Sequence, residues 1–196
     1  GLQAEVAFNM QKGSALGGKY GADFSLNYST AYSIHKDYYP ATDTLNAVQY
    51  GYRTEWFKLG QILYYQDFNA RWYQKVNKSL VMTLTYFNIS YNQSVLADGL
   101  GDQAQIEDPS KTNMVFVNAG VAELLLKIKP KHYIRTEFQA QFSQQDRGNM
   151  AMILAEYSIS PHWFFTLQNI YNYGHPDEAM RIHYPLGSVV YVVGTT

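Results

Sequence analysis

Cysteine is absent from this 196-residue sequence, and charged residues make up only 16% of it. Without cysteine the chain cannot form a disulfide framework, a zinc ribbon, a thioether-linked haem site or a thiol nucleophile. The formal net charge is −1, and the 15 Lys and Arg residues are scattered along the chain. Because no basic patch is available to attract a phosphate backbone, we do not expect nucleic acid as a partner.

Long apolar runs are missing as well. Stretches such as Ala151–Ala155 fall well short of the roughly 20 residues that a membrane-spanning helix needs. Yet hydrophobic residues make up 46% of the chain and aromatic residues 16%, which is far above the content of a disordered chain. Plentiful apolar residues without apolar runs indicate that they are spread over every second position, as in strands.

The clearest alternation runs from Tyr20 to Ile34. Aromatic, aliphatic and Thr side chains occupy the even positions there, and mostly small or polar ones the odd positions. Strict period two over this length predicts a strand. At about 3.3 Å per residue the strand would reach roughly 50 Å, whereas soluble strands usually have about 5–6 residues. A tilted strand that crosses a bilayer and projects beyond it accounts better for the length.

Further segments alternate less strictly, with one apolar face and one face that carries charge. In the later segments the alternation breaks or slips, which we attribute to bulges. The register before Tyr64 stays open, because His35–Asn46 and Lys58–Gln61 do not follow the pattern. With Tyr20–Ile34 we expect about ten strands, the others lying near Leu2–Phe8, Val48–Trp56, Asp67–Trp72, Leu80–Tyr91, Met114–Leu126, Ile134–Phe142, Ala151–Tyr157, Trp163–Tyr173 and Arg181–Val193.

The connections between the expected strands fall into two classes. Short turns on one side and long polar loops on the other are typical of outer-membrane barrels. Aromatic residues gather near expected strand ends, where amphipathic rings favour the depth of the lipid headgroups. The simpler interpretation is that any sheet is rich in aromatic residues. The short turns are Lys75–Lys78, Lys129–Lys131 and Ser160–Pro161, and the long loops are Asn92–Thr112, Gln144–Asn149 and Gly174–Ala179.

The charged faces give the candidate site. Charges are costly on the lipid face of a barrel, so these side chains should line the lumen or its rim. They could form the charged constriction of a pore that selects small polar solutes. Alternatively, they pair across strands and fill a narrow lumen without conduction. The candidate lumen-lining residues are Arg53, Glu55, Asp67, Arg71, Arg135, Glu137, Glu156 and Arg181.

Catalytic and metal sites have little support. The sequence contains neither G-x-S-x-G nor H-E-x-x-H, and we expect no enzyme. Ser and His could still meet on adjacent strands without any linear motif, as in a lipid-hydrolysing barrel. The histidines fall at expected strand ends or loops, which weakens that case; they are His35, His132, His162, His175 and His183. Two acidic loops could bind a divalent cation, but loops of this composition are commonly just solvated. They contain His175–Glu178 and the residues Asp98, Asp102, Glu107 and Asp108.

The most specific part of a family resemblance is the series IRTEFQ, QDRGNM, EYSISPHWFF and YNYG within Tyr133–Gly174. With several other segments, this series resembles an uncharacterised Bacteroidota family of outer-membrane barrel proteins. The resemblance departs in the loop Ala97–Thr112 and at Val193–Thr196, where such barrels end on an aromatic residue. It implies a fragment of a longer member and brings no catalytic residues. The other resembling segments are Tyr20–Ile34, Leu63–Ser79, Tyr86–Asn92 and Arg181–Gly194.

We therefore expect one all-β domain over residues 1–196, an antiparallel up-and-down transmembrane β-barrel of the bacterial outer membrane, incomplete in this chain. Gly1–Glu5 carry no signal peptide, so an export signal should have been removed or lie upstream. The expected function is porin-like or transport-related, with outer-membrane lipid as partner and no cofactor. One alternative is a non-conducting structural or accessory subunit of a larger outer-membrane complex. Another is a soluble β-sandwich or lipocalin-like binding protein.

Overall fold

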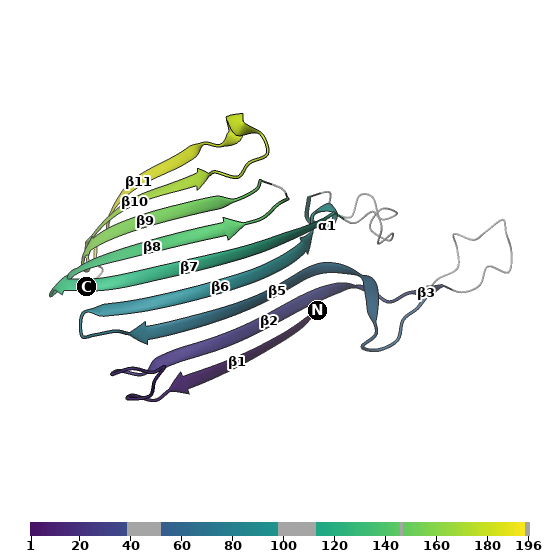
Figure 1. Ribbon diagram of the computed structural model, residues 1–196, viewed down its shortest axis with the longest axis horizontal. Coiled ribbons are helices and arrows are strands. Elements are labelled where there is room, and N and C mark those ends of the chain that lie inside the picture. Colours follow the sequence, from purple (N-terminus) through teal and green to yellow (C-terminus); the bar gives the residue numbers. More distant parts are fainter. Residues whose placement is uncertain (39–51, 98–112, 146, 195–196) are drawn as a thin grey trace. The chain divides into compact units, whose positions relative to one another are not determined.

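A single nine-stranded sheet dominates the computed structural model, which describes residues 1–38, 52–97, 113–145 and 147–194 (Figure 1). The strands are antiparallel and follow the order β1-β2-β5-β6-β7-β8-β9-β10-β11, so each pairs with its neighbours along the chain. They are β1 (Leu2–Met10), β2 (Ala22–Ile34), β5 (Leu59–Lys75), β6 (Leu80–Asn92), β7 (Met114–Lys129), β8 (His132–Phe142), β9 (Met150–Ile159), β10 (Trp163–Asn172) and β11 (His183–Tyr191).

The remaining elements are short. Strands β3 (Asp37–Tyr38) and β4 (Tyr52–Arg53) form a separate two-stranded sheet. Helix α1 spans Gln93–Ala97, and the 3₁₀ turn η3 spans Glu178–Met180. No helix among the described residues is long and apolar enough to cross a membrane.

Two compact units divide the chain. Unit 1 contains β3, β4, α1 and one end of the strands β1, β2, β5, β6 and β7. Unit 2 contains the rest of those strands and all of β8 to β11, and no α-helix among its described residues. Unit 1 comprises Gly1–Gln3, Ser29–Gln66 and Ser90–Val115, and unit 2 comprises Ala4–Tyr28, Asp67–Ile89 and Phe116–Thr196.

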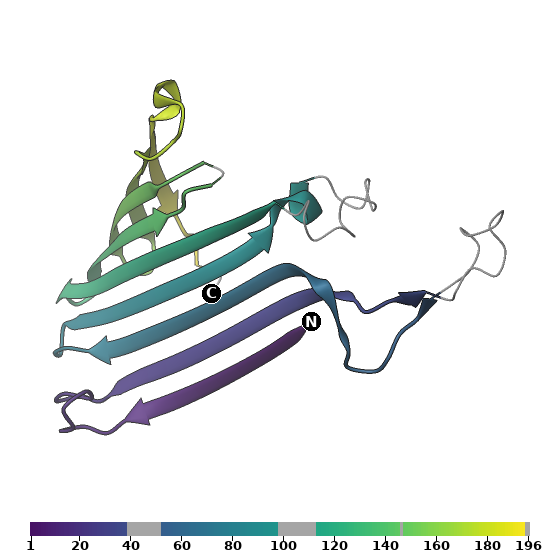
Figure 2. The same cartoon turned by 45° about the vertical axis from the view of Figure 1, so that its right-hand side comes forward.

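Tight turns connect β7 to β8 and β9 to β10, and the antiparallel course of β7 to β10 can be followed in Figure 2. Pro130 and Lys131 join β7 to β8. Lys131 has a φ of 68°, a backbone conformation that a type II turn requires after its proline. Asn77 shapes the turn between β5 and β6, where its side-chain oxygen accepts hydrogen bonds from the Ser79 and Leu80 amides. This local turn chemistry sets strand neighbours in chain order.

The structure confirms the prediction of an all-β, antiparallel up-and-down sheet, but the described strands do not close into a barrel. β1 and β11 each pair with a single neighbour, so both are edges of the sheet. The boundaries expected for the strands from Leu80 onward lie within two residues of those observed, apart from Leu126, since β7 continues three residues further to Lys129. The predicted long loop Asn92–Thr112 includes residues 98–112, which lie outside the described residues.

One predicted strand is wrong in the part that the structure describes. Of the described residues 52–56 of the expected strand Val48–Trp56, only Tyr52 and Arg53 are in a strand, and they pair with Tyr38 and Asp37 outside the main sheet. Thr54 and Glu55 have no regular structure, and a turn follows in which Phe57 adopts a φ of 65°, which strand residues do not adopt. Residues 48–51 lie outside the described residues. The main sheet resumes at β5, which begins at Leu59. This is five residues before Tyr64, up to which the sequence had left the register open.

Very little of the described chain forms a dry core. The hydrophobic residues that are buried there are Ala22, Ile62, Val115, Val117 and Leu154. Many large apolar side chains stay exposed instead, among them Phe138, Ile153 and Leu167. A soluble domain of this length hides most of its large aliphatic and aromatic side chains. The described strands therefore form a sheet with little internal core.

Candidate functional site

The register of unit 2 separates two faces of the sheet. Arg135 of β8 lies opposite Glu156 of β9, and Glu156 lies opposite Thr166 of β10. Directly paired residues share a face, and side chains alternate along each strand. Phe138, Ile153 and Leu167 therefore share the opposite face, with Phe138 paired to Ile153. We call the first the polar face and the second the apolar face.

Side chains on the apolar face are more exposed to solvent than those on the polar face. On β9, Ile153 of the apolar face is 49% exposed, whereas the next residue, Leu154 of the polar face, is 9% exposed. On β8, Phe138 is 47% exposed, whereas 14% of the Glu137 side chain is exposed. Leu167 on β10 is 70% exposed. The sheet thus shelters its charged face and leaves its apolar face open, the reverse of what water as solvent favours.

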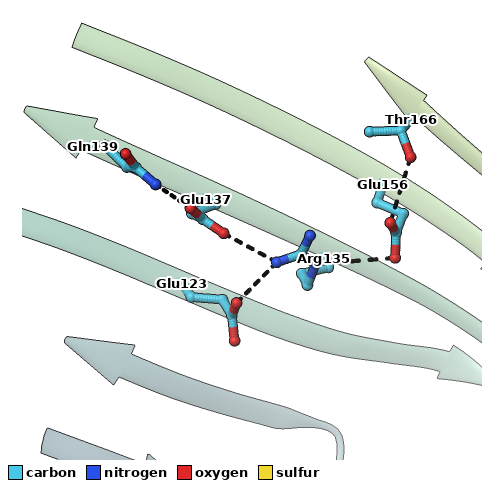
Figure 3. A network of polar contacts seen from close by, with 6 residues as sticks. All are labelled: Glu123, Arg135, Glu137, Gln139, Glu156 and Thr166. Atoms are coloured by element: carbon cyan, nitrogen blue, oxygen red, sulfur yellow. Dashed lines mark hydrogen bonds and ion pairs between the residues drawn. The ribbon is translucent and has the colours of Figure 1, made fainter. Parts of the chain in front are cut away.

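Arg135 is the centre of a charged cluster on the polar face (Figure 3). Its Nη1 donates to Glu123 Oε2 on β7 and to Glu137 Oε2 on its own strand, both at 3.0 Å. Its Nε lies 3.9 Å from Glu156 Oε1 on β9. One guanidinium therefore bridges three adjacent strands, and each of the four side chains is at most about one third exposed. We call these four residues the Arg135 cluster.

Neutral donors extend the cluster along and across the sheet. Gln139 Nε2 donates to Glu137 Oε1, and Thr166 Oγ1 of β10 donates to Glu156 Oε2 at 3.4 Å. Figure 3 shows these side chains following one another from β7 to β10. The cluster holds three carboxylates against one guanidinium, which leaves an excess of two negative charges when all four are ionised. Such a surface attracts cations and repels anions.

The apolar face of β10 has aromatic side chains at both ends, with Leu167 and Asn169 between them. At the turn end, Trp163 stacks on Phe165 with ring centroids 5.9 Å apart, and lies 4.7 Å from Tyr191 of β11. At the loop end, Tyr171 stacks on His183 at 4.1 Å. The eight steps from Trp163 to Tyr171 span about 26 Å of strand, or about 20 Å along the normal of a bilayer at a tilt near 40°. Aromatic girdles flank an apolar band of similar height in membrane barrels.

Three of the predicted lumen-lining residues come together in the structure: Arg135, Glu137 and Glu156. The sequence prediction missed the fourth, Glu123, which sits among aliphatic residues of β7. A signal for it was available, since Glu123 is a charge inside an apolar strand and shares the odd-position face with Lys127. Pairing decides its role, because Glu123 lies directly opposite Glu137.

Two further candidates lie on β5 of unit 2. Ala70 and Trp72 line a shallow apolar hollow together with Phe138. Asp67 and Arg71 alternate with them and therefore point to the polar face. Asp67 accepts a hydrogen bond from Asn69 at 3.5 Å, at the limit of hydrogen-bond distance.

The other three candidates lie in connecting segments. Arg53 is an exposed residue of β4, and Glu55 pairs with Lys58 at 3.5 Å, both within unit 1. Arg181 follows η3, where it contacts Glu178 at 3.2 Å and donates to the His175 carbonyl. It therefore lies outside the strand that the sequence pattern had predicted to begin there.

One family model matches the full chain, residues 1–196. The chain belongs to DUF6029, a family of unknown function. No curated protein and no solved structure matches it. Membership in DUF6029 assigns no activity to the chain, because the function of the family is unknown.

No cluster of three or more metal-ligating side chains occurs among the described residues of this DUF6029 chain. The loop residues His175 and Asp177 are engaged with each other, since His175 Nδ1 accepts from the Asp177 amide at 3.0 Å. The Asp177 carboxylate caps η3 by accepting from the Ala179 amide. Asp98, Asp102, Glu107 and Asp108 of the other acidic loop lie outside the described residues.

Proposed function

We propose that the chain forms part of the wall of a transmembrane β-barrel in a bacterial outer membrane, with a porin-like or transport role. The apolar face contacts lipid, and the Arg135 cluster faces a water-filled lumen. The observation that carries this proposal is the inverted exposure of unit 2, where Phe138 and Ile153 are open while Glu137 is sheltered. Lipid favours apolar side chains outside, and the lumen accommodates the charged ones.

Aromatic placement supports the same orientation independently. Trp163, Phe165 and Tyr191 would lie at one membrane interface, and Tyr171 with His183 at the other. Leu167 and Ile153 would lie between them in the hydrocarbon region. Tyr and Trp favour interfaces because each ring has an apolar body and a polar group.

The Arg135 cluster supports a role in ion selection. A lumen lined by three carboxylates and one guanidinium favours cations over anions. The family members would then pass small cationic or neutral polar solutes. The strength of this selection depends on the width of the lumen.

Membrane fractionation and conductance test this proposal. The protein should fractionate with outer-membrane lipid and need detergent to stay in solution, and in planar bilayers it should give discrete, cation-selective conductance. Replacing Arg135 with Gln should shift the reversal potential further toward cations. The exposed loop residue Arg147 provides a matched control, because Arg147→Gln removes the same charge away from the described sheet. A soluble protein would overturn the proposal.

A second candidate function is a non-conducting structural or accessory subunit of an outer-membrane complex. The 3.0 Å contacts of Arg135 with Glu123 and Glu137 favour it, because paired charges can fill a narrow lumen. Membrane-inserted protein that is silent in bilayers and copurifies with a stoichiometric partner would favour this role over transport.

A further inference from the structure

Seven of the ten lysines lie at one end of the strands of unit 2. The turns from β1 to β2, from β5 to β6 and from β7 to β8 are all at this end, at the left of Figure 1. These lysines are scattered in the sequence and form no basic run, but the up-and-down topology brings them together. They are Lys12, Lys19, Lys75, Lys78, Lys127, Lys129 and Lys131, and all are exposed. We call them the lysine rim.

Backbone hydrogen bonds connect neighbouring turns along the rim. The Lys127 amide donates to the Ser79 carbonyl at 2.7 Å, which joins the end of β7 to the turn after β5. The Ser160 amide donates to the Lys131 carbonyl at 2.7 Å, which joins the turn after β9 to the turn after β7. The rim is therefore a continuous surface of unit 2.

Lys19 and Lys75 show how closely the positive charges are gathered. Their Nζ atoms lie 5.9 Å and 5.4 Å from the centroid of the same Tyr20 ring. An aromatic ring attracts an ammonium group, but it brings no net negative charge to offset the repulsion between two of them. A phosphate group beside Tyr20 would offset that repulsion.

Acidic residues are missing from this end of the strands. Residues 10–22, 74–81, 126–133 and 158–164 contain neither Asp nor Glu, although the whole chain has 16 acidic residues against 15 basic ones. None of the seven lysines forms an ion pair with a described residue. Beyond the opposite ends of the strands, Lys58 and Arg181 each pair with a carboxylate. Protein surfaces ordinarily mix both signs of charge, so a rim of one sign is better explained by an anionic partner.

The position of the rim indicates lipid as the source of the anions. Trp163, Phe165 and Tyr191 lie at the same end of the strands, and their rings favour the depth of a membrane interface. Lipid phosphates lie next to that depth. Clusters of roughly four to eight basic residues beside a membrane bind anionic headgroups. In bacterial barrels the short turns are on the periplasmic side.

We propose that the lysine rim binds the headgroups of anionic phospholipids in the periplasmic leaflet of the membrane. This inference rests on the proposed membrane function. The seven ammonium groups are spread over three turns and the strand ends beside them, so they contact several headgroups at once and do not enclose a single one. Phospholipids with a net negative charge therefore collect at this end of the strands in preference to zwitterionic ones.

Lipid selectivity in reconstituted membranes tests the rim. The protein would be inserted into phosphatidylcholine vesicles that contain a trace of spin-labelled lipid. Electron paramagnetic resonance then gives the association constant of labelled phosphatidylglycerol relative to labelled phosphatidylcholine. The parent protein should prefer phosphatidylglycerol by about twofold or more. Salt at about 1 M should abolish the preference, because it shortens the screening length to about 3 Å.

A set of three substitutions removes one lysine at each of the three turns. The Gln variant should lose about half of the preference or more, whereas an Arg variant at the same positions keeps the charges and should keep the preference. The control removes three positive charges beyond the opposite ends of the strands and should leave the preference unchanged. The rim variant combines Lys12→Gln, Lys78→Gln and Lys129→Gln, and the control combines Lys36→Gln, Lys58→Gln and Arg147→Gln.

Three results would overturn the lysine rim without touching the membrane function. One is inserted protein that shows no preference for phosphatidylglycerol. Another is a control that loses as much preference as the rim variant, since net charge alone would then be responsible. The third is inserted protein that shows no lipid preference but sediments with isolated peptidoglycan through these lysines, which would make the cell wall the partner. Failure of the membrane function would be recognised separately, as protein that stays in solution without detergent.

Discussion

At the scale of single residues, the two neighbours Leu167 and Gln168 distinguish lipid from water as the environment of the sheet. They are adjacent on β10 but point to opposite faces, and Leu167 is among the most exposed apolar residues described. A charge at such an exposed position costs almost nothing in a soluble protein, because surface substitutions usually change stability by no more than about 0.5 kcal/mol. On the lipid face of a barrel the same charge must be removed from water.

Leu167→Arg is therefore expected to destabilise the protein by about 2–4 kcal/mol near the middle of the bilayer. Gln168→Arg, the control on the polar face, should cost far less because its side chain faces the lumen. Denaturant-induced unfolding of the protein refolded into lipid vesicles would measure both. A Leu167→Arg variant as stable as the parent protein would contradict a lipid-facing β10.

Arg135 gives a second prediction at this scale. Arg135→Gln removes the cation from three carboxylates and should destabilise the protein by about 1 kcal/mol, a modest value because the groups are partly exposed and screened. Glu137→Gln in the Arg135→Gln background should cost less than it does alone, since the repulsion between the carboxylates is relieved. A double-mutant cycle on unfolding free energies measures the coupling. If the changes in unfolding free energy of the two single variants simply add in the double variant, Arg135 and Glu137 do not interact.

At the scale of the elements, alternation predicts a strand only where a partner is available. The segments Tyr52–Trp56 and Ile134–Phe138 share the same arrangement of Arg and Glu between apolar residues. Only the second is a full strand, because β7 and β9 pair with it on both sides. Strand pairing depends on residues far apart in the sequence. The local pattern therefore could not show that the main sheet does not include Thr54 and Glu55. The later strands were predicted well because each of them pairs with the next strand in the chain.

The turn after β7 is strained at Lys131. Lys131 has a positive φ, which costs an L-residue with a side chain about 1 kcal/mol or more. Lys131→Gly should therefore stabilise the hairpin of β7 and β8 by up to about 1 kcal/mol, measured as a higher denaturant midpoint. Lys129→Gly, two positions earlier at the end of β7, should instead be neutral or destabilising. A loss of stability in Lys131→Gly would show that the side chain makes a contact that outweighs the backbone strain.

At the scale of the whole molecule, the sequence predicted the sheet and its two faces but not closure. Period two along Tyr133–Phe142 was enough to place Arg135 and Glu137 together on one face. It could not identify Glu123, whose role depends on the register between β7 and β8. Barrel closure depends on how the edges β1 and β11 are paired, and no local pattern encodes that pairing. The barrel and its membrane therefore stay a proposal that direct measurement must test.

The most direct measurement is the environment of the two faces in a bilayer. Nitroxide labels on single cysteines at Phe138 and Leu167 should be relaxed strongly by oxygen, which concentrates in lipid. Labels at Gln139 and Gln168 should be relaxed mainly by a water-soluble nickel complex. If the agent that relaxes the label more strongly alternates between oxygen and the nickel complex from one residue to the next, one face contacts lipid and the other contacts water. Equal access of the nickel complex to all four labels would contradict it.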